Sequence, residues 1–410
     1  MTSSLFELAD TAASLDEADP LIGYRSRFLR HDDPGIVAYL DGNSLGRPLA
    51  ASAERLAAFV TDEWAGRLIR GWDESWYELP LTIGDRLGDI VLGAAAGQTT
   101  IGDSTTVLLY KLACGALNLR PGRTEIVLDR ENFPTDRYLI ESIAADRGLV
   151  VRWIDVDLAG GVTTDALDAV VSAQTALVVL SHVAYRSGYL IDVPAAVDII
   201  HEAGALLLLD LCHSAGSVEV DLDGWGVDFA AGCTYKYLNG GPGSPAFAYV
   251  AACHLDDFRQ PVWGWMGRHN PFEMEQGYVP AQGIRRVISG TPAIIGMLPI
   301  QDSVDLIAEA GITAIRAKSV ALTEFALQAV DTVLGDRGVV VSSPRDPQRR
   351  GGHITIDHPD FKAVTATLWE RGIIPDFRRP DGIRLGLSPL STSFPEVLAG
   401  VSAIAEQLGG

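Results

Sequence analysis

Short apolar runs alternate with amphipathic stretches between about residue 85 and residue 300. Four of these runs have the length and the β-branched or leucine-rich composition of strands: Glu125–Leu128, Leu149–Ile154, Ala176–Leu180 and Ala205–Leu209. The last two are continuously apolar and the first two nearly so, which is typical of parallel strands covered on both faces. Between the last two, Val193–Ala203 carries apolar positions at helical spacing. The alternation predicts an α/β fold with a doubly wound, mostly parallel sheet.

The last third of the chain has a different pattern. A long helical stretch near Gln301–Leu334 is followed by a loop rich in Pro, Arg and Gly at Ser342–Gly352. A strand at His353–Ile356 and a helix–strand–helix order follow, which indicates a smaller α+β domain closing over the first. We therefore expect residues 50–300 to form the large domain, and residues 1–49 and 301–410 to form the small one. The sequence contains no internal repeat.

Charge and composition exclude several classes of function. The 410 residues carry a formal net charge of −21, which disfavours nucleic acid and anionic membrane surfaces as partners. No apolar run reaches the roughly 20 residues of a membrane helix, and the first residues do not resemble a secretory signal. The four cysteines are far apart and form no CxxC pair, so we expect a reduced, cytoplasmic protein without a metal site.

A carboxylate ends one of the predicted strands. Asp210 follows five apolar residues, and a buried aspartate is costly unless a cation or hydrogen-bond donors offset its charge. It could cap a helix, form a structural ion pair, or hold a protonated pyridine nitrogen. His213, three positions later, could lie against the same ring, bond Asp210, or have a purely structural role.

Only four of the 32 basic residues are lysines, namely Lys111, Lys236, Lys318 and Lys362. Lys236 lies in a mainly apolar and aromatic stretch, and a glycine-rich turn follows it. Desolvation favours the neutral amine that attacks an aldehyde, although such a lysine can also extend to the surface. The separation of 26 positions between Asp210 and Lys236 is the arrangement of fold-type I enzymes that use pyridoxal 5′-phosphate.

Hydroxyl groups precede the helical run Val107–Leu117 in the segment Gly102-Asp-Ser-Thr-Thr106. Hydroxyls and free backbone N–H groups at a helix N-terminus form an anion site, and this one could hold the cofactor's phosphate or be a plain helix cap. Ile288-Ser-Gly-Thr291-Pro is a second, weaker set.

Six motifs along the chain resemble those of kynureninases and occur in the same order. They are Asp41-Gly-Asn-Ser-Leu-Gly46, Glu131-Asn-Phe-Pro-Thr-Asp136, Asp210-Leu-Cys-His213, Thr234-Tyr-Lys-Tyr-Leu-Asn239, Gly264-Trp-Met-Gly267 and Asp381-Gly-Ile-Arg384. The first, second and fourth are specific in combination, whereas the third is shared with the wider class-V aminotransferase superfamily. The resemblance covers about residues 39–395 and implies the fold-type I fold, with residues 50–300 binding the cofactor.

The resemblance also implies a role for individual residues. Lys236 would form the Schiff base with the cofactor, Asp210 would pair with its pyridine nitrogen, and Phe133 would stack on its ring. Positions that match phosphate contacts are Thr105, Thr106 and Tyr235, and further cofactor contacts are Asp136, Ser181 and His213. Trp265 and Thr291 match positions that reach the phosphate from the neighbouring subunit, which implies a homodimer with shared sites.

The substrate-binding residues that the resemblance implies are Asn43, Trp72 and Arg384. Arg384 would hold the substrate α-carboxylate in a bidentate fork, although the residue pattern alone would suit a surface arginine. Trp72 occupies a position where animal enzymes that prefer 3-hydroxykynurenine resemble one another in having histidine; it could equally be a core or subunit-interface aromatic. One departure is Arg268, which stands where the family often has histidine.

The expected reaction is hydrolysis of L-kynurenine, or 3-hydroxykynurenine, at the Cβ–Cγ bond to anthranilate, or 3-hydroxyanthranilate, and L-alanine. Lys236 and Tyr235 would be the catalytic residues, with Tyr235 as a proton relay. The resemblance places such an enzyme in tryptophan catabolism, on the kynurenine pathway and towards NAD biosynthesis. The alternatives are another class-V enzyme, such as an aminotransferase or a cysteine desulfurase or lyase, and a non-enzymatic descendant of the fold. No cysteine has an obvious setting on a reactive loop, which disfavours a desulfurase.

Overall fold

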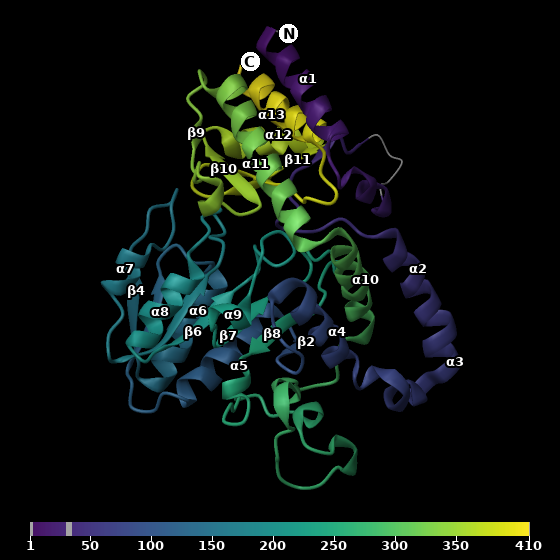
Figure 1. The fold of residues 1–410 in the computed structure, drawn as a ribbon, viewed down its shortest axis with the longest axis vertical. Helices are drawn as coiled ribbons and strands as arrows, with labels where there is room; N and C mark the ends of the chain where they lie inside the picture. The colour runs from purple at the N-terminus through teal and green to yellow at the C-terminus, as the bar shows by residue number, and fades with distance from the viewer. Residues whose placement is uncertain (1–2, 30–34, 410) are drawn as a thin grey trace.

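The computed structural model describes residues 3–29 and 35–409, which form a large lower part and a smaller upper part (Figure 1). The large part is built on a sheet of seven strands in the order β2-β8-β7-β6-β5-β3-β4. Its strands are β2 (Thr99–Gly102), β3 (Glu125–Asp129), β4 (Val150–Ile154), β5 (Thr175–Ser181), β6 (Leu206–Asp210), β7 (Phe229–Gly232) and β8 (Ala246–Val250). All neighbouring pairs are parallel except those made by β8. The predicted mostly parallel α/β sheet is therefore confirmed.

Alternate residues of the central strands enter two cores, one on each face of this sheet. Along β5, Leu177 and Val179 pack on one face, and Val178 and Leu180 pack on the other. Helices α5 (Thr105–Asn118) and α6 (Pro134–Arg147) cover the first face. The second face is covered by α4 (Leu79–Leu87), α7 (Thr164–Asp168), α8 (Val193–Glu202), α9 (Leu222–Trp225) and α10 (Ile294–Ala310). This double cover explains why β5 and β6 are apolar at nearly every position.

The smaller part holds a four-stranded antiparallel sheet in the order β12-β13-β10-β9. Its strands are β9 (Val340–Val341), β10 (His353–Asp357), β12 (Asp376–Arg378) and β13 (Gly382–Gly386), while β1 (Ala38–Tyr39) pairs in parallel with β11 (Ile373–Ile374). The helices are α1 (Ser3–Glu17), α11 (Ile312–Leu334), α12 (Phe361–Glu370) and α13 (Phe394–Leu408). A separate apolar core joins them. The N-terminal helix thus packs with the C-terminal third of the chain.

The long helical stretch near residues 301–334 is two helices rather than one. α10 ends at Ala310 and α11 begins at Ile312, because Gly311 between them has φ +80°. Met297, Ile300 and Val304 of α10 belong to the core of the large sheet. The boundary at residue 301 stays a prediction, but residues 301–310 pack with the large part.

Two peripheral regions expose many apolar side chains. On the right of Figure 1, α2 (Ala50–Ala58) and α3 (Ala65–Arg67) lead into a π-helical turn at Trp72–Trp76. At the lower end, the segment between β8 and α10 projects from the body of the molecule (Figure 1). The exposed residues of these regions are Val60, Trp64, Leu68, Ile69, Val262, Trp263, Trp265, Phe272, Met274 and Val279.

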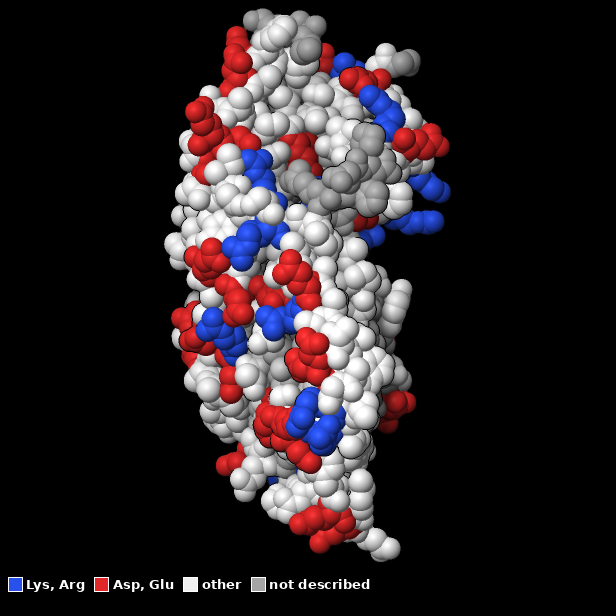
Figure 2. Space-filling view, turned by 90° about the vertical axis from the view of Figure 1, so that its right-hand side faces the viewer, with Lys and Arg blue, Asp and Glu red and all other residues white. Residues whose placement is uncertain are grey.

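Acidic and basic side chains are interspersed on the face seen in Figure 2, with wide uncharged areas between them. Within the described ranges, no helix is long and apolar enough to cross a membrane.

Candidate active site

Neighbouring strands of the large sheet end together and bring the predicted chemistry to one edge. Ser181, the last residue of β5, pairs with Asp210, the last residue of β6, and Asp210 pairs with Ala231 of β7. Lys236 follows the end of β7 at Gly232 by one short turn. In parallel sheets this edge, at the carboxyl ends of the strands, is where ligands bind.

Lys236 is buried, and its nearest polar partner is a histidine. Its Nζ lies 3.1 Å from Nε2 of His213 and 5.9 Å from the centre of the Phe133 ring. Burial lowers the pKa of His213 well below its ordinary value, and the charge of Lys236 lowers it further. His213 is therefore neutral, and its Nε2 lies within hydrogen-bond distance of the lysine amine.

The other three lysines have settings that exclude them as the Schiff-base residue. The buried Lys111 is 2.5 Å from Asp103, and the buried Lys318 pairs with Asp19. Lys362 is exposed on α12. Within the described residues, Lys236 is thus the buried lysine that has no carboxylate within ion-pair distance, a setting that suits a Schiff-base amine.

Two carboxylates lie together beside this lysine. Oδ1 of Asp210 accepts a hydrogen bond of 2.7 Å from the backbone of Cys212. Burial raises the pKa of Asp136 well above its ordinary value, and the nearby charge of Asp210 raises it further. Oδ2 of Asp136 is buried and has no hydrogen-bond partner among the described residues. A protonated pyridine nitrogen would supply the cation that this pair lacks, so the two residues fit the cofactor.

The phosphate end of the predicted site is a cavity of about 350 Å³. Thr105 and Thr106 form the first turn of α5, where Ser104 caps the helix through the N–H of Val107. Tyr235 and Thr291 line the same cavity. Free N–H groups and hydroxyls at a helix N-terminus suit a phosphate dianion. Burial raises the pKa of Tyr235, so its phenol stays protonated and can donate to a phosphate oxygen.

Arg384 is buried on β13, not on the surface, and its guanidinium is already occupied. Nε donates to Asp376 of the adjacent strand at 2.8 Å, and Nη1 donates to the backbone carbonyl of Tyr185 at 2.5 Å. Arg378 also pairs with Asp376, at 3.1 Å. A substrate carboxylate would therefore compete with Asp376 for the fork of Arg384.

The turn that contains Asn43 packs directly against the lysine loop. The N–H of Gly46 donates to the carbonyl of Tyr235 at 2.8 Å. Both polar atoms of the Asn43 side chain are fully buried and lack a partner in the part of the chain that the structure describes. The neighbouring residue Ser44 lies 3.2 Å from Nη2 of Arg384. Unpaired buried polar groups at this position suit a residue that binds a ligand.

Trp72 and Trp265 lie outside this group of residues. Trp72 lines an apolar cavity of about 300 Å³ with Phe59, Trp64 and Trp76, and its ring meets that of Trp76 edge-on at 5.7 Å. This cavity shares only Pro292 and Ala293 with the phosphate cavity. Trp265 is 38% exposed and packs against Phe272. Within one chain neither indole is brought to Lys236.

Arg268 has a structural setting. Its guanidinium donates to the carbonyls of His269 and Gly277 and pairs with Glu275 at 2.9 Å. It thus holds the turn that projects from the lower end of the large part.

Sequence reasoning missed three residues of the site. Asn132 accepts hydrogen bonds from Ser181 and from the N–H of Phe133, and so fixes the aromatic ring. The Tyr185 ring meets the Phe133 ring edge-on at 5.3 Å, and Asp376 holds Arg384. Asn132 stands within a recognised motif and could have been found there. Tyr185 and Asp376 had no signal, because strand pairing brings them to the site: β5 with β3 for Tyr185, and β12 with β13 for Asp376.

Solved structures of similar fold are enzymes of the class-V group. The apo cysteine desulfurase of Thermococcus onnurineus superposes with a TM-score of 0.80 at 19% identity, covering 91% of this chain and 95% of its own. A C-DES variant with glycine covalently linked to pyridoxal phosphate gives 0.82 at 18% identity, covering 93% and 99%. The fold and the side chains at its strand ends define a fold-type I enzyme dependent on pyridoxal 5′-phosphate.

Sequence relatives resolve the family within that class. The kynureninase of Burkholderia pseudomallei (strain K96243) is 40% identical over 408 residues, covering 97% of this chain and 95% of its own length. That of Pseudomonas fluorescens is 39% identical over 403 residues, covering 96% and 94%. A family model described as the kynureninase C-terminal domain matches residues 315–404. The chain belongs to the kynureninase family.

Proposed function

We propose that this enzyme hydrolyses L-kynurenine at the Cβ–Cγ bond, giving anthranilate and L-alanine. The observation that carries the proposal is the setting of Lys236. It is buried near Asp210, Asp136 and Phe133, and within the described residues it forms no ion pair. Membership of the kynureninase family supports this reaction over the other reactions of fold-type I pyridoxal-phosphate enzymes.

The residues at the strand ends and at the start of α5 would hold the cofactor. Thr105, Thr106 and Tyr235 would hold the phosphate, Asp210 would keep the pyridine nitrogen protonated, and Phe133 would cover the ring. When bound, pyridoxal phosphate supplies the electron sink that makes the substrate Cα–H bond acidic.

Lys236 would hold the cofactor until the substrate amine replaces it, and the freed amine would then move the Cα proton. Neutral His213 lies within hydrogen-bond distance of Nζ and would orient it. Water would add to the carbonyl carbon of the substrate side chain as the Cβ–Cγ bond breaks. Tyr235 would relay the proton between phosphate and the reacting carbon.

The substrate's α-carboxylate would bind to Arg384. Asp376 pairs with both Arg384 and Arg378. If Asp376 kept only its ion pair with Arg378, the guanidinium of Arg384 would be free to bind the substrate carboxylate. Buried Asn43 would use its unpaired amide on the same substrate.

We further propose that the enzyme is a homodimer with the site at the subunit interface. Exposed large apolar side chains gather on two regions, with Trp263 65% exposed and Ile69 76% exposed, far more than a monomer usually presents in one place. Trp265 would reach the partner's phosphate site from the projecting segment. Thr291, which lines the phosphate cavity of its own chain, would also contact the partner's phosphate. All four cysteines are free, which supports a reducing, cytoplasmic location on the kynurenine pathway of tryptophan catabolism.

Trp72 would favour kynurenine over 3-hydroxykynurenine. Its indole would stack on the aryl ring across the subunit interface and offers a single N–H, where a histidine could bond a ring hydroxyl. The preference would be modest, because a group of this size discriminates by about 1–3 kcal/mol in an apolar pocket.

The test is product analysis with both substrates side by side. We expect anthranilate and alanine in equal amounts, a higher kcat/KM for kynurenine, and a shift of the ratio in Trp72→His. Preference for the hydroxylated substrate, or an unmoved ratio, would remove Trp72 as the specificity residue. Release of sulfide from cysteine without cleavage of kynurenine would instead favour the desulfurase alternative, whose fold this chain shares.

A further inference from the structure

A second cavity, of about 390 Å³, lies between the large and small parts, and its lining is separate from that of the phosphate cavity. His182, Leu190 and Ile191 of the segment after β5 form one wall, and Val218 and Trp225 form another. Arg316 of α11 and the loop residues Gln348 and Arg349 close it from the small part. The cavity is therefore shared by both parts of the molecule.

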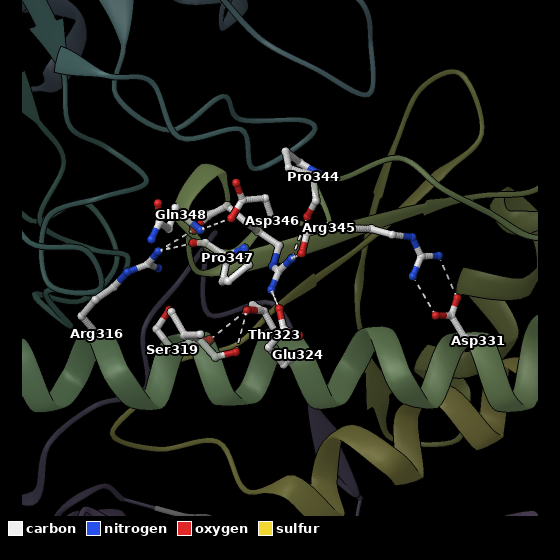
Figure 3. Close-up of polar contacts among 12 residues, drawn as sticks. Arg316, Ser319, Thr323, Glu324, Asp331, Pro344, Arg345, Asp346, Pro347 and Gln348 are labelled. Carbon is white, nitrogen blue, oxygen red and sulfur yellow. Dashed lines mark hydrogen bonds and ion pairs between the residues drawn. The ribbon is translucent and has the colours of Figure 1, made fainter. Parts of the chain in front are cut away.

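Two buried nitrogen atoms of residues that line this cavity lack a hydrogen-bond partner among the described residues. Nη2 of Arg316 donates to the carbonyls of Pro347 and Arg350, both at 2.8 Å, and Figure 3 shows this side chain reaching from the helix to the loop. Nη1 of the same guanidinium is buried without a partner in residues 3–29 and 35–409, and so is Nδ1 of His182.

Arg316 also forms no ion pair within the described residues. No carboxylate of the described chain lies within ion-pair distance of it, whereas neighbouring Arg350 pairs with Glu324. Burial lowers the pKa of Arg316, as does the charge of Arg350, whereas the charge of Glu219 raises it. Burial also lowers the pKa of His182 to about 3, with Arg316 contributing, so this ring is neutral and one nitrogen can donate. A desolvated cation with unused donors costs free energy unless an anion offsets it.

The acidic residues of the cavity lie at its rim. Asp192 and Glu219 are exposed, and Asp192 faces Arg349 at 3.7 Å while Glu219 accepts a hydrogen bond from Thr313. Water screens these charges more than the charge of Arg316 deeper inside. The wall between rim and guanidinium is apolar, with Leu190, Ile191, Val193, Val218 and the Trp225 ring, which meets His182 edge-on at 5.4 Å.

We infer that this interdomain cavity binds a small organic carboxylate, with its charged group on Arg316 and His182 and its apolar body along Trp225. A guanidinium and a neutral imidazole supply directed donors to one carboxylate, and the apolar wall favours an organic anion over an inorganic one. His182 directly follows Ser181, and its backbone N–H donates to the carbonyl of Asp210 at 2.9 Å. The carboxylate thus sits directly behind the strand ends that carry the cofactor residues.

The probe is 4-fluorobenzoate, titrated into the holoenzyme and followed by fluorine NMR, with neutral 4-fluorobenzamide as the matched comparison. We expect saturable binding of the carboxylate alone and a rise in Tm as it saturates. Arg316→Gln should weaken this binding about tenfold or more, because a charge-assisted hydrogen bond is lost. Arg316→Lys should keep part of it.

Two further variants keep the test decisive if Arg316→Gln disturbs the fold. Arg345→Gln is the control: Arg345 lies on the same loop but pairs with Asp331, away from Arg316 along the helix (Figure 3), and should bind like the native enzyme. Glu219→Gln removes a rim charge and should strengthen binding about twofold. Equal binding of the amide, equal binding by Arg316→Gln and native protein, or weaker binding in Glu219→Gln would each overturn the inference.

Discussion

Several side chains of the proposed site are distinguished by a missing hydrogen-bond or ion-pair partner among the described residues, as well as by the contacts that they make. Lys236 is buried beside a neutral histidine, while the other buried lysines face carboxylates. Asp136 keeps an unpaired buried oxygen, and Asn43 keeps an unpaired amide. Native structures leave few such groups unsatisfied, so a cluster of them marks a ligand site.

Replacing Lys236 tests the assignment most directly. Lys236→Ala should lose the visible absorbance of the bound cofactor, and turnover should fall by several orders of magnitude. The other buried lysines, Lys111 and Lys318, are held by carboxylates and should not replace it. Borohydride treatment of the native enzyme should attach the cofactor to the peptide that contains Lys236. Attachment to Lys111 instead, which is held by Asp103, would contradict the structure-based choice.

Arg384 and Asp376 form a second pair whose chemistry can be measured. Arg384→Lys should raise KM strongly with a smaller effect on kcat, since an ammonium cannot reproduce the two parallel hydrogen bonds of the fork. Asp376→Asn should lower KM, because it removes the carboxylate that competes with substrate. If both variants keep the native KM, the substrate carboxylate binds elsewhere.

At the scale of elements, the site depends on close backbone contact between the turn at residues 41–46 and the loop of Lys236. A Cβ on Gly46 would lie 2.2 Å from the carbonyl oxygen of Lys236 and 2.2 Å from Oδ1 of Asn239. The turn comes from the N-terminal region and the loop from the large sheet, so this contact fixes the lysine from outside its own sheet.

Gly46→Ala should therefore damage the site beyond its effect on stability. We expect a loss of about 1–3 kcal/mol in the free energy of unfolding, the usual range for overpacking, together with weaker cofactor binding. Gly66→Ala is the matched control, since a Cβ there meets nothing within 4 Å. Chemical denaturation and titration with pyridoxal phosphate measure the two effects. Native-like cofactor affinity in Gly46→Ala would show that the turn does not position the lysine.

At the scale of the whole molecule, two exposed apolar regions are the main feature that formation of a homodimer would explain. The aromatic cavity around Trp72 and the projecting segment around Trp265 are both open to solvent in one chain. Neither belongs to the group around Lys236, although family resemblance gives both a role there. A second copy of the chain would bury both exposed apolar regions and would also complete the site around Lys236.

Mixed dimers test this arrangement. Lys236→Ala and Trp265→Ala chains should each be impaired alone, and their mixture should regain part of the activity, because one of the two sites in a hybrid dimer has both native residues. Activity is assayed after the mixed chains are unfolded and refolded together, with each variant alone as the control. A fully active monomer in sedimentation experiments would refute shared sites.

The sequence by itself determined the class of fold and the chemically distinctive residues. Continuous apolar runs at β5 and β6 predicted the buried parallel sheet, since periodicity is a local property that burial imposes on each strand. Asp210 and Lys236 could be chosen because a carboxylate after an apolar run and a lysine in apolar surroundings are unusual. The helical stretch expected near residues 301–334 is present but interrupted, because Gly311 at positive φ separates α10 from α11.

Only the tertiary structure decided what these residues meet. Asp376 occupies the fork of Arg384 because β12 and β13 are paired in a particular register, and Tyr185 reaches Phe133 because they lie on the loops after two neighbouring strands, β5 and β3. The Nη1 of Arg316, which has no partner among the described residues, has no signature in the sequence. The partners of a guanidinium come from segments far along the chain. Local patterns record which residues are buried, whereas partners depend on long-range contacts that no local pattern encodes.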